Sequence, residues 1–268
     1  MRRLGRGVAI AIGSYLVLAY LLLPSLWRHY EHLPAMASMP KVTQGTDGLP
    51  GDPLNVALIG SEAAIQRAFA ASGWKPADPI TLRSSLAIAG SVVFDHPDLE
   101  APVSNLLLFG RPQDLAFEKE VGSNARQRNH VRFWRTELRA DDDRPVWVGG
   151  ASFDQGAGLS HTTGQITHHI APDLDHERDT LMRDLTTAGR LTALYDVTGI
   201  GPTADGRNAG GDRYFTDGEL AVGVLASEDA AGKGTVAVLG SPTPVVIKNQ
   251  LWSWLRPVLG GGRTDTAP

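Results

Sequence analysis

The chain is 268 residues long and 42% hydrophobic, which is enough for one main domain with a buried core plus additional segments. Its net charge of −4 and pI of about 6.0 give no overall basic field, so nucleic acid is not an expected partner. Because the sequence has no cysteine, disulfides, thiolate zinc sites and a cysteine nucleophile are excluded.

An uncharged apolar stretch, residues 7–27, lies near the N-terminus between Arg6 and Arg28. At about 1.5 Å per residue, a helix of this length covers the roughly 30 Å hydrocarbon core of a bilayer. Arg2, Arg3 and Arg6 precede the stretch, so the positive-inside rule predicts that residues 1–6 are cytoplasmic. We therefore expect a single-pass protein of the bacterial cytoplasmic (inner) membrane, with its C-terminal domain outside the cytoplasm.

Two alternatives to a permanent anchor stay open. A cleaved signal peptide would use the A-x-A pattern at Ala35-Met36-Ala37, although the distance from Leu23 to Ala35 is long for a cleavage region. The other alternative is a buried helix of a soluble protein.

Residues 28–53 are predicted to be a linker, because the prolines and glycines that recur over residues 33–53 oppose regular structure. The folded domain is expected over residues 54–226. Residues 227–268 are expected to form a C-terminal extension that ends in a disordered tail.

The folded domain is expected to begin with a strand and two helices. Leu54–Ile59 has the pattern of a buried strand. Ser61 is a candidate cap for a helix that ends at Gly73, and a second helix is predicted from Thr81.

The middle of the chain is predicted to be rich in strands, because short β-branched or aromatic runs alternate with turn residues. The predicted strands are Ser104–Phe109, Asp114–Val121, Asn129–Leu138, Arg144–Phe153 and Gln165–Ile170. Short connections between them favour antiparallel pairing.

A helix is then expected from Asp173 to Gly189. The predicted elements after it are strands Leu191–Val197, Tyr214–Leu225 and Thr235–Leu239 and a short helix Val245–Leu255, with a glycine-rich loop at Gly199–Gly211. The order of these elements predicts an α+β fold, a mostly antiparallel sheet with flanking helices, preceded by one transmembrane helix.

The predicted strand around Asn129–Leu138 carries basic side chains on one face, because alternate residues of a strand point the same way. Arg126, Arg128, His130 and Arg132 share that face with Trp134. One interpretation is an anion-binding surface, since guanidinium groups suit phosphate or carboxylate. The other is a cross-strand charge ladder, in which Glu118 and Glu120 of the preceding strand face Arg128 and His130.

Histidine and carboxylate residues concentrate around the start of the predicted helix at Asp173. His168 and His169 precede it, and the acidic or imidazole side chains that follow are Asp173, Asp175, His176 and Glu177. These groups suit zinc or a similar divalent metal, but the spacing matches no compact metal signature. Adjacent histidines in a strand point to opposite faces, and carboxylates in a first helical turn also serve as caps, so capping is the alternative.

The run 206–219 mixes glycines with Asp212, Arg213 and Asp217, which makes it a candidate ligand-binding loop. The alternative is an ordinary connection, because Asp217-Gly218 is a typical hairpin sequence. Neither a nucleophile elbow nor a phosphate-binding loop is present in the sequence.

Several motifs in order resemble the LssY C-terminal domain family. They are LNVALIG (54–60), SGWKPADPITLRSS (72–85), APVSNLLLFG (101–110), QDLAFEK (113–119), NHVRFWRT (129–136), VWVGGASFD (146–154), TGQITHH (163–169) and GDRYFTDG (211–218). Members of the family occur attached to membrane-embedded segments, sometimes beside lipid-phosphatase-like domains. The resemblance implies no particular reaction, and this chain departs from the larger architectures by having one hydrophobic span and no lipid-phosphatase motif.

Three functions are hypotheses at this point. The first is binding of an anionic envelope component, such as a lipid headgroup, through Arg128, His130 and Arg132. Further candidate ligand-binding residues are Lys119, Asp212, Arg213 and Asp217. The second is a hydrolase of an envelope substrate, in which His130, His169 and Asp154 converge with the loop at 211–217, where a divalent metal could be bound. The third is a structural domain that docks onto another membrane protein.

Overall fold

The computed structural model describes residues 2–25, 39–45, 48–77, 106–122, 127–162, 164, 166–198, 204–227, 235–247, 250–251 and 254. The chain divides into two compact units. One unit is Met39–Gly240, and the other combines Met1–Ser38 with Ser241–Pro268.

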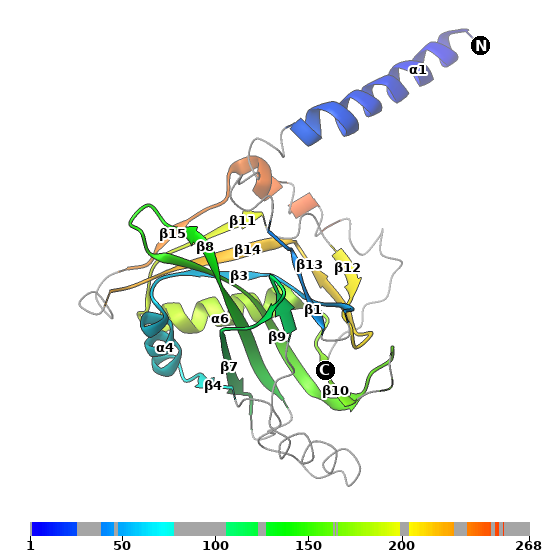
Figure 1. The fold of residues 1–268 in the computed structure, drawn as a ribbon. Helices are drawn as coiled ribbons and strands as arrows, with labels where there is room; N and C mark the ends of the chain where they lie inside the picture. The colour runs from blue at the N-terminus through cyan, green and yellow to red at the C-terminus, as the bar shows by residue number, and fades with distance from the viewer. Residues whose placement is uncertain are drawn as a thin grey trace. The chain divides into compact units, whose positions relative to one another are not determined.

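The N-terminal segment is helical, as predicted. Helix α1, Arg2–Val17, continues into a π-helical turn, η1, Leu18–Leu22 (Figure 1). The stretch Gly5–Ser25 is one helix of 21 residues that is long and apolar enough to cross a membrane. Among the described residues it is the one candidate span, and a membrane anchor is the role that it suggests.

A nine-stranded sheet organises the larger unit (Figure 1). Its strand order is β15-β11-β14-β3-β9-β8-β7-β4, and β10 pairs with β9. The strands are β3 Val56–Ile59, β4 Lys75–Pro76, β7 Leu115–Glu120, β8 Arg128–Arg139, β9 Pro145–Leu159, β10 Ile166–Ile170, β11 Leu191–Thr198, β14 Glu219–Leu225 and β15 Ala237–Leu239. All neighbours are antiparallel except β3 with β14 and β11 with β15, so the predicted α+β class with a mostly antiparallel sheet is confirmed.

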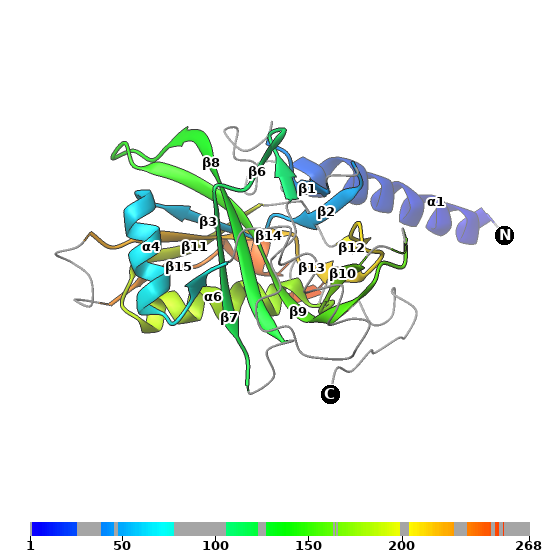
Figure 2. The same cartoon turned by 60° about the horizontal axis from the view of Figure 1, so that its bottom comes forward.

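Two helices, α4 (Glu62–Ala71) and α6 (Leu174–Thr187), bury one face of this sheet (Figure 2). Their ends match the predicted caps, because Ser61 accepts a hydrogen bond from Ala64 N and Asp173 accepts one from His176 N. Apolar side chains from both helices and the sheet form one core, with Phe69 stacked on Phe117 at a ring separation of 4.1 Å.

A smaller four-stranded sheet, in the order β2-β1-β5-β6, approaches the opposite face of β8. Its strands are β1 Val42–Gly45, β2 Pro50–Pro53, β5 Leu106–Leu108 and β6 Arg111–Pro112. The prediction that residues 33–53 lack regular structure is therefore wrong for β1 and β2. Prolines are tolerated in β2 because it is an edge strand, and Thr43 fastens the pair by donating to Asp52 O at 2.8 Å.

The predicted single strand Tyr214–Leu225 is also wrong, because it is broken in two at Asp217-Gly218, where Gly218 has φ +81°. The first part, β13 (Arg213–Thr216), pairs with β12 (Ala204–Arg207), whereas β14 joins the main sheet. The expected hairpin is thus absent at this dipeptide, which instead passes the chain from one sheet to another. The helix predicted from Thr81 lies outside the described residues.

Candidate functional site

Strand β8 divides its side chains between the core and the opposite face, as its alternation predicts. Val131 and Phe133 point into the core under the helices. Arg128, His130 and Arg132 point the other way, and each is at most 5% exposed. The face of β8 that the sequence predicts to be basic is therefore buried.

Carboxylates from three other strands compensate the two buried arginines. Arg128 Nη1 lies 3.0 Å from Glu118 Oε2, and its Nε lies 3.4 Å from Asp154 Oδ2. Arg132 Nη1 lies 3.5 Å from Asp52 Oδ2. The register pairs Glu118 with His130, so the cross-strand charge pairing considered from the sequence is present.

His130 lies between an acid and a hydroxyl. Its Nδ1 is 3.0 Å from Asp154 Oδ1, a contact that is not aligned as a hydrogen bond. Its Nε2 is 2.8 Å from Ser152 Oγ and 2.8 Å from Arg132 Nη1. Because a guanidinium only donates, Nε2 accepts here, which leaves the proton of a neutral imidazole on Nδ1 beside Asp154.

A small pocket of about 70 Å³ opens beside this group. Charged and imidazole groups on its wall come from Asp52, His130, Arg132, Asp154 and His168. The other lining residues are Gly51, Leu106, Ile170 and the turn at 208–210. His168 enters through β10, with its Nε2 3.2 Å from Arg128 Nη2.

Burial and charge act against each other in the pocket. Burial alone would raise the pKa of Asp154, but His130, His168 and Arg128 outweigh it, so that this pKa lies well below its usual range. Burial lowers the pKa of His168, with Asp154 opposing, and lowers that of Arg132. Asp154 is therefore an anion at neutral pH, fixed beside an imidazole.

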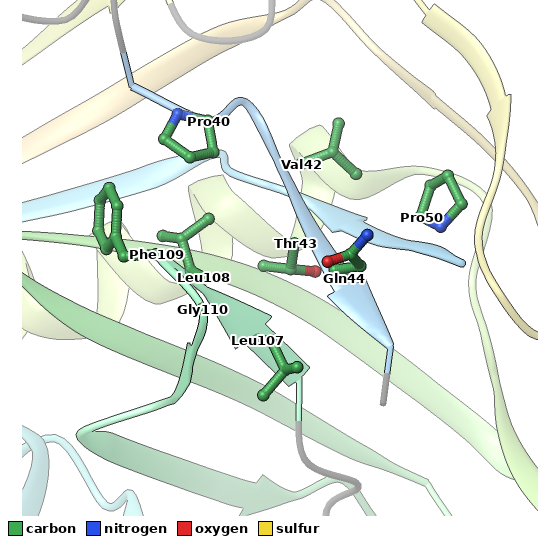
Figure 3. Close-up of a pocket in the computed structure, with 9 residues that line it drawn as sticks. All are labelled: Pro40, Val42, Thr43, Gln44, Pro50, Leu107, Leu108, Phe109 and Gly110. Atoms are coloured by element: carbon green, nitrogen blue, oxygen red, sulfur yellow. The ribbon is translucent and has the colours of Figure 1, made fainter. Parts of the chain in front are cut away.

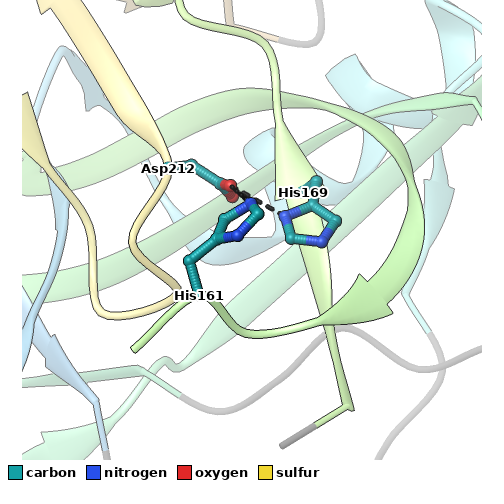
Figure 4. A group of neighbouring side chains, drawn as sticks. All are labelled: His161, His169 and Asp212. Carbon is teal, nitrogen blue, oxygen red and sulfur yellow. Dashed lines mark hydrogen bonds and ion pairs between the residues drawn. The ribbon is translucent and has the colours of Figure 1, made fainter. Parts of the chain in front are cut away.

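A second group of side chains, on the other side of β10, contains His169. His169 Nδ1 lies 2.7 Å from Asp212 Oδ1, and the ring centroids of His169 and His161 are 5.0 Å apart (Figure 4). The predicted convergence of His130, Asp154 and His169 is thus divided. His130 and Asp154 meet, while the adjacent residues His168 and His169 serve opposite sides of the strand.

The acidic residues after His169 do not gather into one metal cluster in the part of the chain that the structure describes. Asp173 caps α6, and Asp175 accepts hydrogen bonds from Thr216 Oγ1 and Asp217 N. Glu177 is 2% exposed, and its Oε1 has no hydrogen-bond partner among the described residues.

Three predicted ligand-binding residues lie away from the pocket. Lys119 faces the helices and binds Asp184 at 2.8 Å. Asp217 is held by Arg178 through two hydrogen bonds of 2.7 and 3.1 Å. Arg213 is exposed on β13.

Sequence reasoning missed Asp52, Ser152 and His161. Ser152 could have been found, because it shares a strand face with Asp154 two residues later. Asp52 was assigned to an irregular linker, and the place of His161 depends on the turn that carries Asp212.

A larger pocket of about 410 Å³ lies on the small sheet, between β1 and the β5–β6 turn (Figure 3). Its described lining residues, which include Val42, Leu107 and Phe109, carry no ionisable side chain. This pocket can bind apolar groups but supplies no acid or base.

Comparison with known proteins gives one match. A family model described as LssY C-terminus matches residues 36–220. This range includes strands β1 and β2 and the residues that line both pockets. No curated protein and no solved structure matches the chain.

Proposed function

The chain belongs to the LssY C-terminal family, and we propose that it is a membrane-anchored hydrolase whose active site is the pocket over His130 and Asp154. The observation that carries the proposal is the 3.0 Å contact between His130 Nδ1 and Asp154 Oδ1 at the wall of that pocket. With Arg132 donating to Nε2, the imidazole proton lies on Nδ1 and faces this carboxylate, which would stabilise the positive charge gained when Nε2 accepts a proton.

Water is the proposed nucleophile. Ser152 Oγ lies within hydrogen-bonding distance of Nε2, but Ser152 is fully buried and is not among the residues that line the pocket. In the proposed step, His130 Nε2 takes a proton from water as its oxygen attacks the substrate. The same proton then passes from Nε2 to the leaving oxygen, which restores the neutral imidazole.

The substrate is proposed to carry a phosphate or carboxylate group. Arg132 lines the pocket, and its Nη1, 2.8 Å from Nε2, competes with water for the lone pair of His130. An anionic group in the pocket would draw the guanidinium towards itself and release Nε2. Asp52 Oδ2 lies 3.5 Å from Arg132 Nη1, which is longer than an ordinary charge-assisted hydrogen bond.

The test uses the full-length protein in detergent with three chromogenic esters: p-nitrophenyl phosphate, bis(p-nitrophenyl) phosphate and p-nitrophenyl acetate. We expect turnover of at least one, and a kcat that falls roughly 10²–10⁴-fold in His130→Gln. The matched control is His176→Gln, because His176 is an exposed histidine on α6 away from the pocket. It should leave kcat unchanged.

Folding of each variant is checked by its thermal transition. Arg132→Lys keeps the positive charge but not the fork, so we expect it to raise KM more than it lowers kcat. If all three esters are stable, or if folded His130→Gln turns one over as fast as the unaltered chain, the hydrolase proposal is wrong.

Binding of an anion without turnover is the second candidate, which the presence of Arg132 and His168 on the pocket wall favours. Titration of the full-length protein with inorganic phosphate tests it by calorimetry. Phosphate binding that is lost in Arg132→Gln, together with no ester hydrolysis, would favour this candidate over the hydrolase. If Arg132→Gln and the unaltered chain bind phosphate equally tightly, the anion-binding candidate is wrong.

We also propose that the domain lies outside the cytoplasm, on the outer side of a bacterial inner membrane. The three arginines before the apolar helix support this orientation. A C-terminal alkaline phosphatase fusion should then be active and a C-terminal green fluorescent protein fusion dark. The reverse pattern would contradict the orientation.

A further inference from the structure

We propose that His161, His169 and Asp212 form a binding site for one divalent transition-metal ion of the Zn²⁺ type. Each residue offers one ligand atom, and these atoms all lie within 4.8 Å of one another. Figure 4 shows the two imidazole rings and the carboxylate turned towards a common point. His161 and His169 come from the turn before β10 and from β10 itself, and Asp212 lies 43 residues after His169, so the fold brings the carboxylate to the two histidines.

The separations are close to those of a metal site. His169 Nδ1 is 2.7 Å from Asp212 Oδ1, and His161 Nε2 is 3.9 Å from the same oxygen. In a tetrahedral zinc site with bonds of about 2.0–2.1 Å, neighbouring ligand atoms are roughly 3.3 Å apart. For these two distances the required changes are therefore of opposite sign and below 1 Å. His161 can supply the shortening, because its side chain is 67% exposed.

Asp212 is held for such a role by its other contacts. Its Oδ2 accepts from Ile170 N at 3.1 Å, and its backbone N donates to Asn208 Oδ1 at 3.0 Å. Oδ1 is thereby left pointing at the two histidines. Fixing a ligand through its second oxygen is what the outer shell of a metal site does.

Two glycines allow the imidazoles to lie where they do. A Cβ on Gly158 would lie 2.7 Å from His169 Nε2, and a Cβ on Gly211 would lie 2.8 Å from His161 Cβ. Gly211 also has φ +87°, which a side chain would oppose. A side chain at either position would therefore press on one of the two histidines.

The donor set selects the class of metal. Two imidazoles and one carboxylate suit Zn²⁺ and its neighbours in the first transition row, whereas Mg²⁺ prefers oxygen ligands and retains its waters. Three protein ligands at a partly exposed site leave a coordination position for water or for a ligand from solution.

This inference is independent of the proposed hydrolase. His130 and Asp154 lie on the other side of β10, and neither contributes a ligand atom to this cluster. Metal binding is measured without any substrate, so one proposal can fail while the other stands.

The experiment is calorimetric titration of the chelator-treated, full-length protein in detergent with zinc sulfate. We expect one equivalent of Zn²⁺ to bind and Mg²⁺ to give no heat at the same concentrations. His161→Ala and Asp212→Asn should each weaken zinc binding at least tenfold. His176→Ala removes an exposed histidine outside the cluster and should bind zinc like the unaltered chain.

His161→Ala is the decisive variant, because so exposed a side chain can be removed without loss of the fold, which the thermal transition checks. Zinc should also raise the melting temperature of the unaltered chain more than that of this variant. The site does not exist if the unaltered chain binds no zinc, or if His161→Ala and the unaltered chain bind it equally tightly.

Discussion

The two sides of strand β10 present the same chemical groups in opposite surroundings. On one side His130 and Asp154 are 3.0 Å apart, and on the other His169 and Asp212 are 2.7 Å apart. The side chains of the first pair are 3% and 1% exposed, and those of the second are 26% and 9% exposed. Distance alone therefore does not assign a role to a histidine–carboxylate pair. Burial favours proton transfer at the first pair, and exposure favours exchange of a bound ligand at the second.

The largest effect that this comparison predicts is on stability. Asp154→Ala removes the partner of two buried groups, Arg128 and His130, and should lower the free energy of unfolding by about 3–5 kcal/mol. Asp212→Ala removes the hydrogen bonds to His169 Nδ1 and Ile170 N and should lower the free energy of unfolding by about 1–3 kcal/mol. Urea denaturation of the full-length proteins in detergent, followed by tryptophan fluorescence, measures both. Equal losses would mean that burial does not distinguish the pairs.

Glu177 sharpens the comparison, because it is buried without the cations that surround Asp154. Burial, with Asp184 and Asp154 adding to it, raises the pKa of Glu177 to about 8. The folded state then holds a proton that the unfolded state releases, so stability should fall as the pH rises from about 4.5 to 8, by at most about 1.4 kcal/mol per unit.

Glu177→Gln imitates the protonated side chain and should remove this slope. Its melting temperature should exceed that of the unaltered chain at pH 8 and approach it at pH 5. The control is Glu62→Gln, at an exposed position in the first turn of α4. If the two melting curves of Glu177→Gln and the unaltered chain kept the same difference at both pH values, Glu177 would not be protonated in the fold.

Gly158→Ala tests the exposed pair alone. The added methyl group would displace the His169 ring, since its carbon would lie 2.7 Å from Nε2. We expect about a tenfold loss of zinc affinity and little change in ester hydrolysis. Gly110→Ala, in a turn with open space around it but with φ +72°, is a control for backbone strain. Unchanged zinc affinity in Gly158→Ala would argue against His169 as a ligand.

The smallest predicted effect belongs to Ser152→Ala. Because the nucleophile is proposed to be water, loss of this buried hydroxyl should lower kcat by less than about tenfold, equivalent to 1.4 kcal/mol. Steady-state kinetics on the ester that the unaltered chain hydrolyses best will show this. A loss as large as that of His130→Gln would instead make Ser152 the nucleophile.

Features that depend on neighbouring residues were predictable from the sequence. The caps at Ser61 and Asp173 and the shared face of Arg128, His130 and Arg132 follow from local pattern alone, and the structure confirms them. For the candidate hydrolytic pair, His130 and Asp154, the residues were predictable but their contact was not. His130 and Asp154 were named, but their contact depends on the register of β8 against β9.

Features that depend on distant pairing were not predictable. Strands β1 and β2 look irregular because their prolines oppose a sheet interior, and it is pairing with β5, some sixty residues later, that completes the sheet. His161 meets Asp212 only because its backbone N bonds to Gly210 O, 49 residues along the chain. No local periodicity encodes such contacts.

The single backbone of β10 joins two compartments, because consecutive residues send one imidazole to each side. His168 reaches Arg128, and His169 reaches Asp212, so any tilt of this short edge strand moves both rings together. If zinc and an anion each fix the strand in one position, each should tighten the binding of the other by the same factor. The membrane-anchored domain would then respond to two solutes at once, with β10 as the coupling element.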